Sequence, residues 1–388
     1  MNAIMTLVII VIVRDMPIRI TFCLPGYAKR PTGGFKIIYE YANRLAQHHA
    51  VSVIHPNLLL TGSPWSEYPL RLAGWVLRQA KLSYGPGSWF SIHPRVQMLT
   101  VPSLHPRHIP SSDVVVATAW TTAEWVARYP ASKGRKLYFV QDYEHLMTAP
   151  DRRRHRIMAT YGKPFTMVVI SPVLQTLLSR NHIECTLIPN ALDDTLYRLN
   201  RPIDTEDRNG LGFPYRPEPY KGTQDVLAAL SPLVDRYNLK GHVWTFGSTS
   251  HPQLPSWVTY HRHPSDHALS ALYNRTKIFV VGSHFEGWGL PGMEAMACGA
   301  ALVSTDHGGI GAYAQDGVNA LLTPIRQPTQ LRDRIESLLN DDTWRRSIAE
   351  NGIQAVKPFT WERSTQMFEH LLSTVSRKQP SSHNGEGF

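Results

Sequence analysis

The feature that most constrains the fold of this chain is a repeated alternation of short apolar runs with segments of helical spacing. Each run is continuous in apolar residues and is bounded by turn residues. Such runs are typical of strands that are buried on both faces, as in parallel sheets covered by helices. In the first half of the chain they fall at residues 114–117, 138–140, 167–170 and 187–189.

The first unit of this alternation lies near the N-terminus. Residues 18–24 alternate apolar with polar or small side chains and predict a strand, and residues 25–34 predict a loop that ends in Gly33-Gly34. From residue 35 the apolar positions recur at helical spacing, and residues 51–54 return to strand. This order predicts the opening of a parallel sheet. Residues 56–110, rich in Trp, Pro and His, predict helices and loops.

A second alternating series follows a segment dense in Pro, Gly and charge, residues 199–220, which predicts a loop or linker. Its helices are predicted at 225–233, 267–273, 293–298 and 331–339, and its strands at 243–246, 278–281 and 302–304. The chain has 388 residues, enough for two domains. We therefore expect two doubly wound α/β domains, residues 16–198 and 199–360, that face each other across a cleft.

The two ends of the chain carry separate expectations. Residues 361–376 predict a C-terminal helix that packs back on the first domain, and the polar composition of residues 377–388 predicts a disordered tail. Residues 3–13 are almost wholly apolar but fall short of the roughly twenty needed to cross a bilayer, and they lack the flanks of a signal peptide. Residues 1–15 are either a membrane-dipping segment or an upstream extension of a protein that begins at Met16, and we favour the second.

The composition limits the classes of binding partner and the cellular compartment that this protein is expected to have. Forty Lys and Arg residues against thirty Asp and Glu residues give a net charge of +10, which favours an anionic ligand, an anionic membrane surface or nucleic acid. The three cysteines, Cys23, Cys185 and Cys298, form no CxxC pair. This spacing argues against a disulfide framework or a zinc site and fits a reducing cytoplasm.

The best candidate for a ligand site is the segment HFEGWGLPGME at residues 284–294, which directly follows the predicted strand 278–281. Its glycines allow close approach of the backbone, and Pro291 suits the first turn of a helix, whose N–H groups face a phosphate. Glu286 and Glu294 are suited to accept hydrogen bonds from sugar or ribose hydroxyls. Alternatively, Glu294 only complements the helix dipole and Glu286 is a solvated loop residue.

Two cations precede this segment in the sequence. Arg216 and Lys221 could neutralise a diphosphate, and Lys221 stands near a predicted helix start, where a cation does not stabilise the helix. Gly33-Gly34 closes the matching loop of the first domain. The chain lacks GxxxxGK[ST] and HExxH, which argues against a P-loop NTPase and a zinc protease. It also lacks Asp-x-Asp, so no obvious carboxylate pair for a metal-bound diphosphate is present.

The densest positive run is formed by Arg152, Arg153, Arg154 and Arg156 around His155. Most such runs are solvated faces. The functional alternative is contact with an anion or with an anionic membrane surface at the inner face of the membrane.

At this point the residues resemble a known family. Glu286 and Glu294 stand as E-x7-E within FEGWGLP and EAMACG, which is similar to the signature of retaining glycosyltransferases of family 4. Pro31-Thr32-Gly33-Gly34, Ile188-Pro189-Asn190, Arg216 with Lys221-Gly222, and Phe359-Thr360-Trp361 follow in family order, with Ala191 where Gly is usual. The resemblance implies the GT-B fold of two Rossmann-like domains and a metal-independent transfer without a resident cofactor.

The resemblance also implies a role for each matching residue. Arg216 and Lys221 would hold the donor diphosphate as it leaves, Glu294 would bind ribose hydroxyls and Glu286 the donor sugar. Gly289 and Leu290 would support the phosphates, and Gly33 and Gly34 would line the cleft floor. Gly247 is also expected to bind the donor. Retention in this family is thought to need no protein nucleophile, so Glu286 is not given that role.

A narrower resemblance rests on residues 39–45 and 139–144, which are similar to a bacterial subgroup that includes rhamnosyltransferases of surface polysaccharides. It implies transfer of a hexose or deoxyhexose from a nucleotide-diphosphate sugar to a glycan or lipid-linked acceptor. The alternatives are a nucleotide-sugar epimerase of the same fold and a non-catalytic protein that binds a glycan or anion. No nucleic-acid-binding module is present in the sequence.

Overall fold

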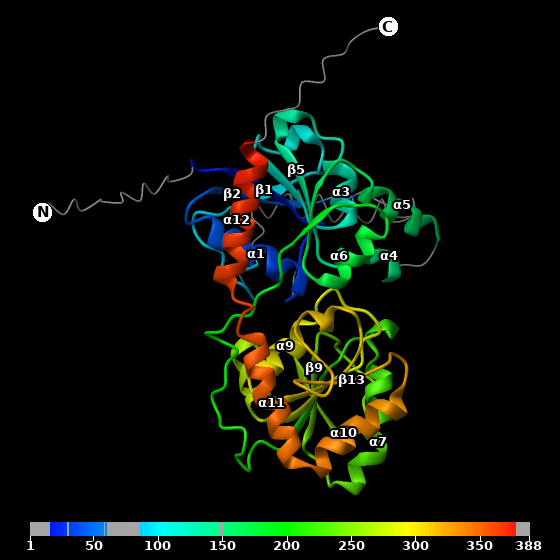
Figure 1. Cartoon of the computed structure of the whole chain (residues 1–388). Coiled ribbons are helices and arrows are strands. Elements are labelled where there is room, and N and C mark those ends of the chain that lie inside the picture. Colours follow the sequence, from blue (N-terminus) through cyan, green and yellow to red (C-terminus); the bar gives the residue numbers. More distant parts are fainter. Residues whose placement is uncertain are drawn as a thin grey trace, which may run out of the picture.

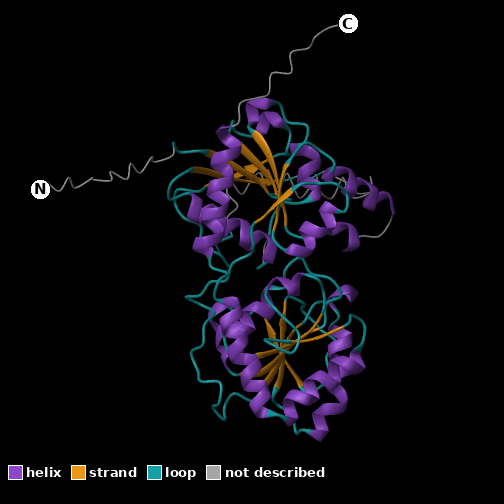
Figure 2. Ribbon diagram, in the orientation of Figure 1, coloured by secondary structure: helices purple, strands orange, loops and turns teal. Residues whose placement is uncertain are grey.

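The computed structural model describes residues 16–28, 31–57, 59, 86–87, 89–147 and 151–377, with Arg152 described by its backbone alone. These residues form two α/β domains, one above the other in Figure 1. In each domain the strands lie at the centre and helices cover both faces of the sheet (Figure 2). The fold predicted from the alternation of strands and helices is confirmed.

The first domain contains a sheet of seven described strands in the order β3-β2-β1-β4-β5-β6-β7. Every neighbouring pair is parallel. The strands are β1 Arg19–Cys23, β2 Ala50–Pro56, β3 Gln97–Val101, β4 Val114–Ala117, β5 Arg135–Val140, β6 Thr166–Val169 and β7 Cys185–Leu187. The described helices are α1 Gly33–Leu45, α3 Trp120–Val126, α4 Glu144–Met147, α5 Asp151–Tyr161 and α6 Pro172–Ser179.

The second domain repeats this plan with six described strands in the order β10-β9-β8-β11-β12-β13, again all parallel. The strands are β8 Gly210–Pro214, β9 Val243–Gly247, β10 Val258–Arg262, β11 Thr276–Val281, β12 Ala301–Thr305 and β13 Leu321–Thr323. The described helices are α7 Thr223–Arg236, α8 Asp266–Asn274, α9 Leu290–Ala297, α10 Pro328–Asn340 and α11 Asp342–Val356. In both sheets the strand order reverses beside the first strand, at β1/β4 and at β8/β11, which is where doubly wound sheets bind ligands.

The prediction that residues 199–220 form a linker was wrong for residues 210–214. These residues are β8, a central strand that pairs with both β9 and β11. The strand contains Gly210 and Gly212 because the Trp244 indole crosses it: a Cβ on Gly212 would lie 2.5 Å from that ring. Close approach of a large side chain therefore explains glycines that otherwise indicate a loop.

Three further strands, β3, β10 and β13, fall outside the predicted set, and β3 lies in the segment where only helices and loops were predicted. All three are edge strands of their sheets. Most positions of β3 and β10 are partly buried or exposed, and β13 has only three residues. An edge strand needs no continuous apolar run because one side of it faces solvent. The runs that predicted strands correspond to buried interior strands such as β4, whose four residues are all buried.

The chain crosses twice between the domains, once after β7 and once before the last helix, α12 Trp361–Arg377. The two crossing segments are hydrogen-bonded to each other: the Leu192 N–H donates to the Phe359 carbonyl oxygen at 2.8 Å. Helix α12 then lies along the first domain, beside α1 (Figure 1). Its Phe368 and Trp361 rings pack on Tyr41, with ring centroids 5.0 Å and 5.2 Å away. This aromatic contact fixes the C-terminal helix to the first domain.

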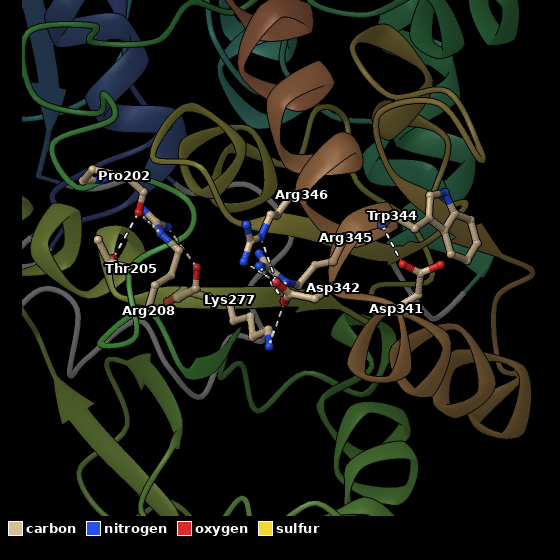
Figure 3. Close-up of polar contacts among 10 residues, drawn as sticks. Pro202, Thr205, Arg208, Lys277, Asp341, Asp342, Trp344, Arg345 and Arg346 are labelled. Carbon is tan, nitrogen blue, oxygen red and sulfur yellow. Dashed lines mark hydrogen bonds and ion pairs between the residues drawn. The ribbon is translucent and has the colours of Figure 1, made fainter.

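The first crossing is anchored to the second domain by a buried cation, Arg208. Its guanidinium donates to the carbonyl oxygen of Pro202 on the crossing segment (Figure 3). It also donates to the carbonyl oxygens of Arg201 on the same segment and of Cys298 at the end of α9. Burial lowers the pKa of Arg208 to about 10. Residues 201 and 202 are thus hydrogen-bonded to the second domain.

No helix in the described ranges is long and apolar enough to span a membrane. Residues 1–15 and residues 378–388 of the predicted tail lie outside the described residues. Arg377, where the tail was predicted to begin, is the last residue of α12. The first strand begins at Arg19.

Candidate active site

A cleft of about 530 Å³ lies at the carboxyl ends of both sheets and is lined by both domains. The first domain contributes residues 31–37 and 118–119 and five residues between 138 and 144. The second domain contributes Pro214, Arg216, Lys221, Ser283, residues 286–291 and Glu294, among others. A separate hollow of about 790 Å³ beside α11 contains none of the predicted site residues. The cleft contains all of them except Gly247.

The loop from Ser283 to Gly289 is held in one shape by contacts that only glycine permits. Gly289 has φ +95 and directly precedes α9, and a Cβ there would lie 2.9 Å from the His307 ring. Gly287 packs on the first domain, where a Cβ would lie 2.1 Å from the Gln141 carbonyl oxygen. The glycines that suggested phosphate binding therefore also bring the loop against its neighbours in both domains.

Glu286 and Lys221 form an ion pair at the centre of the cleft, with 2.8 Å between Oε2 and Nζ. The Ser283 hydroxyl donates to the other carboxylate oxygen at 2.8 Å. Burial alone would raise the pKa of Glu286, but Lys221, His307 and Ser283 hold it below its ordinary value. Burial alone would lower the pKa of Lys221, but the Glu286 carboxylate raises the pKa of this lysine above its ordinary value. Both groups are therefore charged at neutral pH.

The position of Lys221 follows from its neighbour Gly222. Lys221 ends a single 3₁₀ turn, Pro219–Lys221, and Gly222 has φ +62 with its Cα against the Gly282 carbonyl. A Cβ on Gly222 would lie 1.7 Å from that oxygen, so a larger residue would push the lysine away from the 283–289 loop. The Lys221-Gly222 dipeptide is thus a geometric unit.

Arg216 lies beside this pair, on the segment that leaves β8. Its guanidinium donates to the Tyr215 carbonyl at 2.8 Å and stacks on the Phe246 ring, 5.4 Å from the centroid. Within the described part of the chain we find no carboxylate in an ion pair with it. The stacking on Phe246 holds the Arg216 guanidinium at the cleft surface and leaves its positive charge without a neutralising carboxylate.

Glu294 lies in the second turn of α9 at the far end of the cleft. The Tyr273 hydroxyl donates to its Oε2 at 3.1 Å. Burial raises the pKa of Glu294 to about 7, even though Lys36 lies near enough to oppose that change. A carboxylate in this state can accept hydrogen bonds from a neutral hydroxyl, and it exchanges a proton near neutral pH.

The predicted glycines fall into two groups. Gly33 is the first residue of α1 and faces Leu290 across the cleft, where a Cβ would lie 4.0 Å from the leucine, and the Gly34 carbonyl accepts from Gln141 at 3.2 Å. Gly247 is not among the residues that line this cleft. Gly247 is buried at the end of β9, and a Cβ there would lie 2.7 Å from the Tyr215 carbonyl, so the glycine serves strand packing.

Sequence reasoning missed four charged residues that line the cleft. Asp142 and Glu144 follow β5 on the first-domain wall, and burial raises the pKa of each to about 7. Lys36, in the first turn of α1, forms an ion pair across the cleft with Asp266. The signal for Asp142 and Glu144 was their position just beyond a predicted strand, 138–140. No local pattern marks Lys36.

The arginine run lies on α5, away from the cleft. Arg156 is committed to Glu124, with Nε and Nη2 at 2.9 Å and 2.6 Å from its carboxylate oxygens, and it stacks over Trp120. Arg154 pairs with Asp151 at 3.4 Å, and Arg153 is exposed. The run is therefore not a uniform basic surface. Across the described residues we find no cluster of three or more His, Cys, Asp or Glu side chains that would hold a metal ion.

Comparison with known proteins gives this cleft a context. Residues 205–355 match the family model described as glycosyl transferases group 1. The second domain is therefore similar to group 1 glycosyltransferases over most of its length. An uncharacterised glycosyltransferase of Methanocaldococcus jannaschii is 34% identical over 108 residues, 28% of this chain and 31% of its own. O-antigen chain mannosyltransferase B of Escherichia coli is 31% identical over 164 residues, 42% of this chain and 37% of its own.

These matches cover only part of each protein. The chain spans about a third of the length of the curated relatives it matches first. Whole-chain similarity comes from solved structures. Sucrose-phosphate synthase of Thermosynechococcus elongatus superposes with a TM-score of 0.67 at 17% identity, covering 92% of this chain and 98% of that one. Anabaena HepE, solved in complex with UDP-glucose, gives the same TM-score and identity, with 92% and 100% covered. The fold is GT-B.

Proposed function

We propose that this protein is a metal-independent retaining glycosyltransferase. It transfers a hexose or deoxyhexose from a nucleotide-diphosphate sugar to a glycan or lipid-linked acceptor in the synthesis of surface polysaccharide or glycoconjugate. The observation that carries the proposal is the Lys221–Glu286 pair. It stands beside Arg216 and the start of α9, inside a domain that matches group 1 glycosyltransferases.

The cations explain how a leaving diphosphate is stabilised. In the proposed complex, Lys221 and Arg216 contact the diphosphate, and the first N–H groups of α9 face its oxygens. Both cations are fixed before the donor arrives, one by Gly222 and the other by the Phe246 ring, so little reorganisation is needed. A metal ion is not required for this charge balance.

The two glutamates divide the donor between them. Glu294 accepts hydrogen bonds from ribose hydroxyls at the deep end of the cleft, and Glu286 accepts from the transferred sugar beside Lys221. The bond between the anomeric carbon and the diphosphate oxygen breaks, and a bond to the acceptor oxygen forms on the same face of the sugar. The acceptor hydroxyl proton passes to the departing diphosphate, so no protein nucleophile takes part.

The acceptor enters from the first domain. Asp142 and Glu144 on that wall are suited to accept hydrogen bonds from acceptor hydroxyls. A lipid-linked acceptor would lie at the cytoplasmic membrane face, with Arg153 and Arg154 of α5 turned to anionic headgroups. Arg156 contributes less to this surface because Glu124 already neutralises it.

The proposal is tested by donor consumption. A panel of nucleotide sugars is first screened by thermal stabilisation, since a ligand at a hundred times its Kd adds about 2.7 kcal/mol to the free energy of unfolding. The stabilising donor should then be consumed only when an acceptor is supplied, and consumption should continue in EDTA. Conversion of the donor sugar without acceptor would indicate an epimerase, and loss of turnover in EDTA, restored by magnesium or manganese, would refute the metal-independent mechanism.

A further inference from the structure

The ion pair between Lys36 and Asp266 joins the two domains across the cleft. Lys36 is in the first turn of α1 in the first domain, and Asp266 is the first residue of α8 in the second. The ammonium nitrogen lies 2.7 Å from the Asp266 carboxylate, with 23% and 46% of the two side chains exposed. The contact is thus partly shielded from water, and both residues line the cleft.

The Lys36 ammonium is surrounded by groups that belong to the other side of the cleft. It lies 5.8 Å from the centroid of the Tyr197 ring, on the crossing segment. Burial would lower the pKa of Lys36, but Glu294 and Asp266 raise it, so the side chain is charged. The strongest of these attractions comes from Glu294, the carboxylate to which we assign ribose binding.

Neither helix gains from a cation in this position. The first turn of α1 has a partial positive charge, and the N-terminus of α8, which meets the same ammonium, has another. The α8 N-terminus is already satisfied by Asp266 and by the Ser265 side chain, which accepts from Ala268 N–H at 3.2 Å. The benefit of a lysine here therefore comes from contacts between the domains and not from the stability of either helix.

We propose that Lys36 is a positioning residue that holds the cleft closed over the donor end by its ion pair with Asp266. Closure brings the first-domain wall, with Asp142 and Glu144, to the acceptor side of the bound sugar. The contact itself rests on the geometry of the ion pair, whereas its effect on turnover rests on the proposed function. Lys36 acts through Asp266 and contributes no bond to the reacting atoms.

The expected effect is modest because the pair is half exposed. Loss of such a pair changes the equilibrium between closed and open forms about two- to fivefold. Since catalysis needs the closed form, kcat should fall by a similar factor. Binding of a bare nucleoside diphosphate should stay within about twofold, because the proposed diphosphate and ribose contacts come from the second domain.

The test is a double-mutant cycle on the full chain with Lys36→Gln, Asp266→Asn and the double variant. Small-angle X-ray scattering of the free protein measures the radius of gyration, and steady-state kinetics with the stabilising donor measure kcat and KM. We expect both single variants to raise the radius of gyration and lower kcat alike, with no further change in the double variant. The exchanged pair, Lys36→Asp with Asp266→Lys, should restore both values in part.

The matched control is Lys277→Gln. Lys277 pairs with Asp342 at 3.1 Å, with 28% and 41% of the side chains exposed, and both residues belong to the second domain (Figure 3). This variant loses a similar pair and should leave the radius of gyration and kcat unchanged.

Two outcomes would overturn the proposal. If Lys36→Gln weakens nucleoside diphosphate binding and Asp266→Asn does not, Lys36 acts on the donor directly or through Glu294 and not through Asp266. If the single variants leave the radius of gyration unchanged, or their effects on kcat add in the double variant, the pair does not hold the cleft closed. Small-angle X-ray scattering tests whether the Lys36–Asp266 pair holds the cleft closed even if the wild-type protein transfers no sugar. Failure of this proposal and failure of the proposed function are therefore distinguishable.

Discussion

The two walls of the cleft differ in how their charge is arranged. The second-domain wall places the cations Arg216 and Lys221 beside Glu286 and Glu294, and it lies within residues 205–355, which match a known family. The first-domain wall carries the carboxylates of Asp142 and Glu144 and lies outside the matched residues. In our proposal the difference reflects the reaction. Every donor presents a diphosphate, which demands fixed cations, whereas acceptors differ and are recognised through hydroxyls.

The largest effect should follow removal of the second-domain cation at the centre of the cleft. Lys221→Ala should lower kcat about a hundredfold to a thousandfold, because one fixed donor of charge to the leaving diphosphate is lost. Lys277→Ala, which removes a lysine from the same domain outside the cleft, is the control. Turnover within about threefold of wild type in Lys221→Ala would remove the main argument for the second-domain wall as the donor side.

The two glutamates of the same wall should be separable. Glu294→Gln should weaken nucleoside diphosphate binding about tenfold to a hundredfold, because a charged acceptor of hydrogen bonds from ribose is lost. Glu286→Gln should lower kcat and leave that affinity nearly unchanged, because its contact to the sugar strengthens as the bond breaks. Isothermal calorimetry with the bare diphosphate distinguishes them. Equal affinity and full turnover in both variants would leave the E-x7-E interpretation without support.

The exposed face of the first domain provides a third comparison. Arg153→Gln with Arg154→Gln should weaken binding to anionic vesicles up to about thirtyfold at low salt, since each basic residue near such a surface contributes about 1 kcal/mol. Flotation with vesicles of neutral and anionic lipid measures this. Replacing the exposed second-domain residues Lys240 and Arg262 by Gln is the matched control. An equal loss from both pairs would indicate attraction by net charge and not a surface on α5.

On the first-domain wall, Asp142→Asn should raise the KM for the acceptor or lower kcat/KM about tenfold through a lost hydrogen bond to a hydroxyl. Nucleoside diphosphate binding should stay within about twofold, which calorimetry checks. A loss of diphosphate affinity as large as that of Glu294→Gln would show that Asp142 belongs to the donor side, and the contrast between the walls would fail.

The smallest effect concerns stability and pH. Burial raises the pKa of Glu294 to about 7, above its ordinary value of 4.5, so its ionisation opposes folding. The stability that the protonated group provides is complete below about pH 4.5 and is lost as the pH rises through 7. Glu294→Gln, which cannot ionise, should therefore gain in Tm relative to wild type between pH 5 and pH 8, by a few degrees at most. A difference in Tm between the variant and wild type that does not change with pH would show that folding does not raise the pKa of Glu294.

Part of the candidate site could be predicted from the sequence because its determinants are local. The strand 278–281, the glycines of the following loop and Pro291 specify a strand, a turn and a helix start within one short segment, and Glu286 and Glu294 are carried with it. Lys221 is tied to the adjacent Gly222 in the same way. These residues lie in the cleft as the sequence indicated. Gly247 does not line the cleft, and the sequence could not predict this, because a glycine that faces a ligand and a glycine packed under a tyrosine carbonyl have the same local pattern.

The sequence by itself determined the alternation of strands and helices, the two-domain α/β plan and the segments that carry the second-domain charges, because each follows from periodicity and turn chemistry over a few residues. Only the tertiary structure decided which charges meet. Lys36 and Asp266 are 230 residues apart in the chain, and Asp142 meets the Glu286 loop only because Gly287 packs on Gln141. It also decided that a glycine-rich segment is the central strand β8, through the Trp244 ring that crosses it. Contacts of this kind depend on how two sheets are brought together, which no short stretch of sequence encodes.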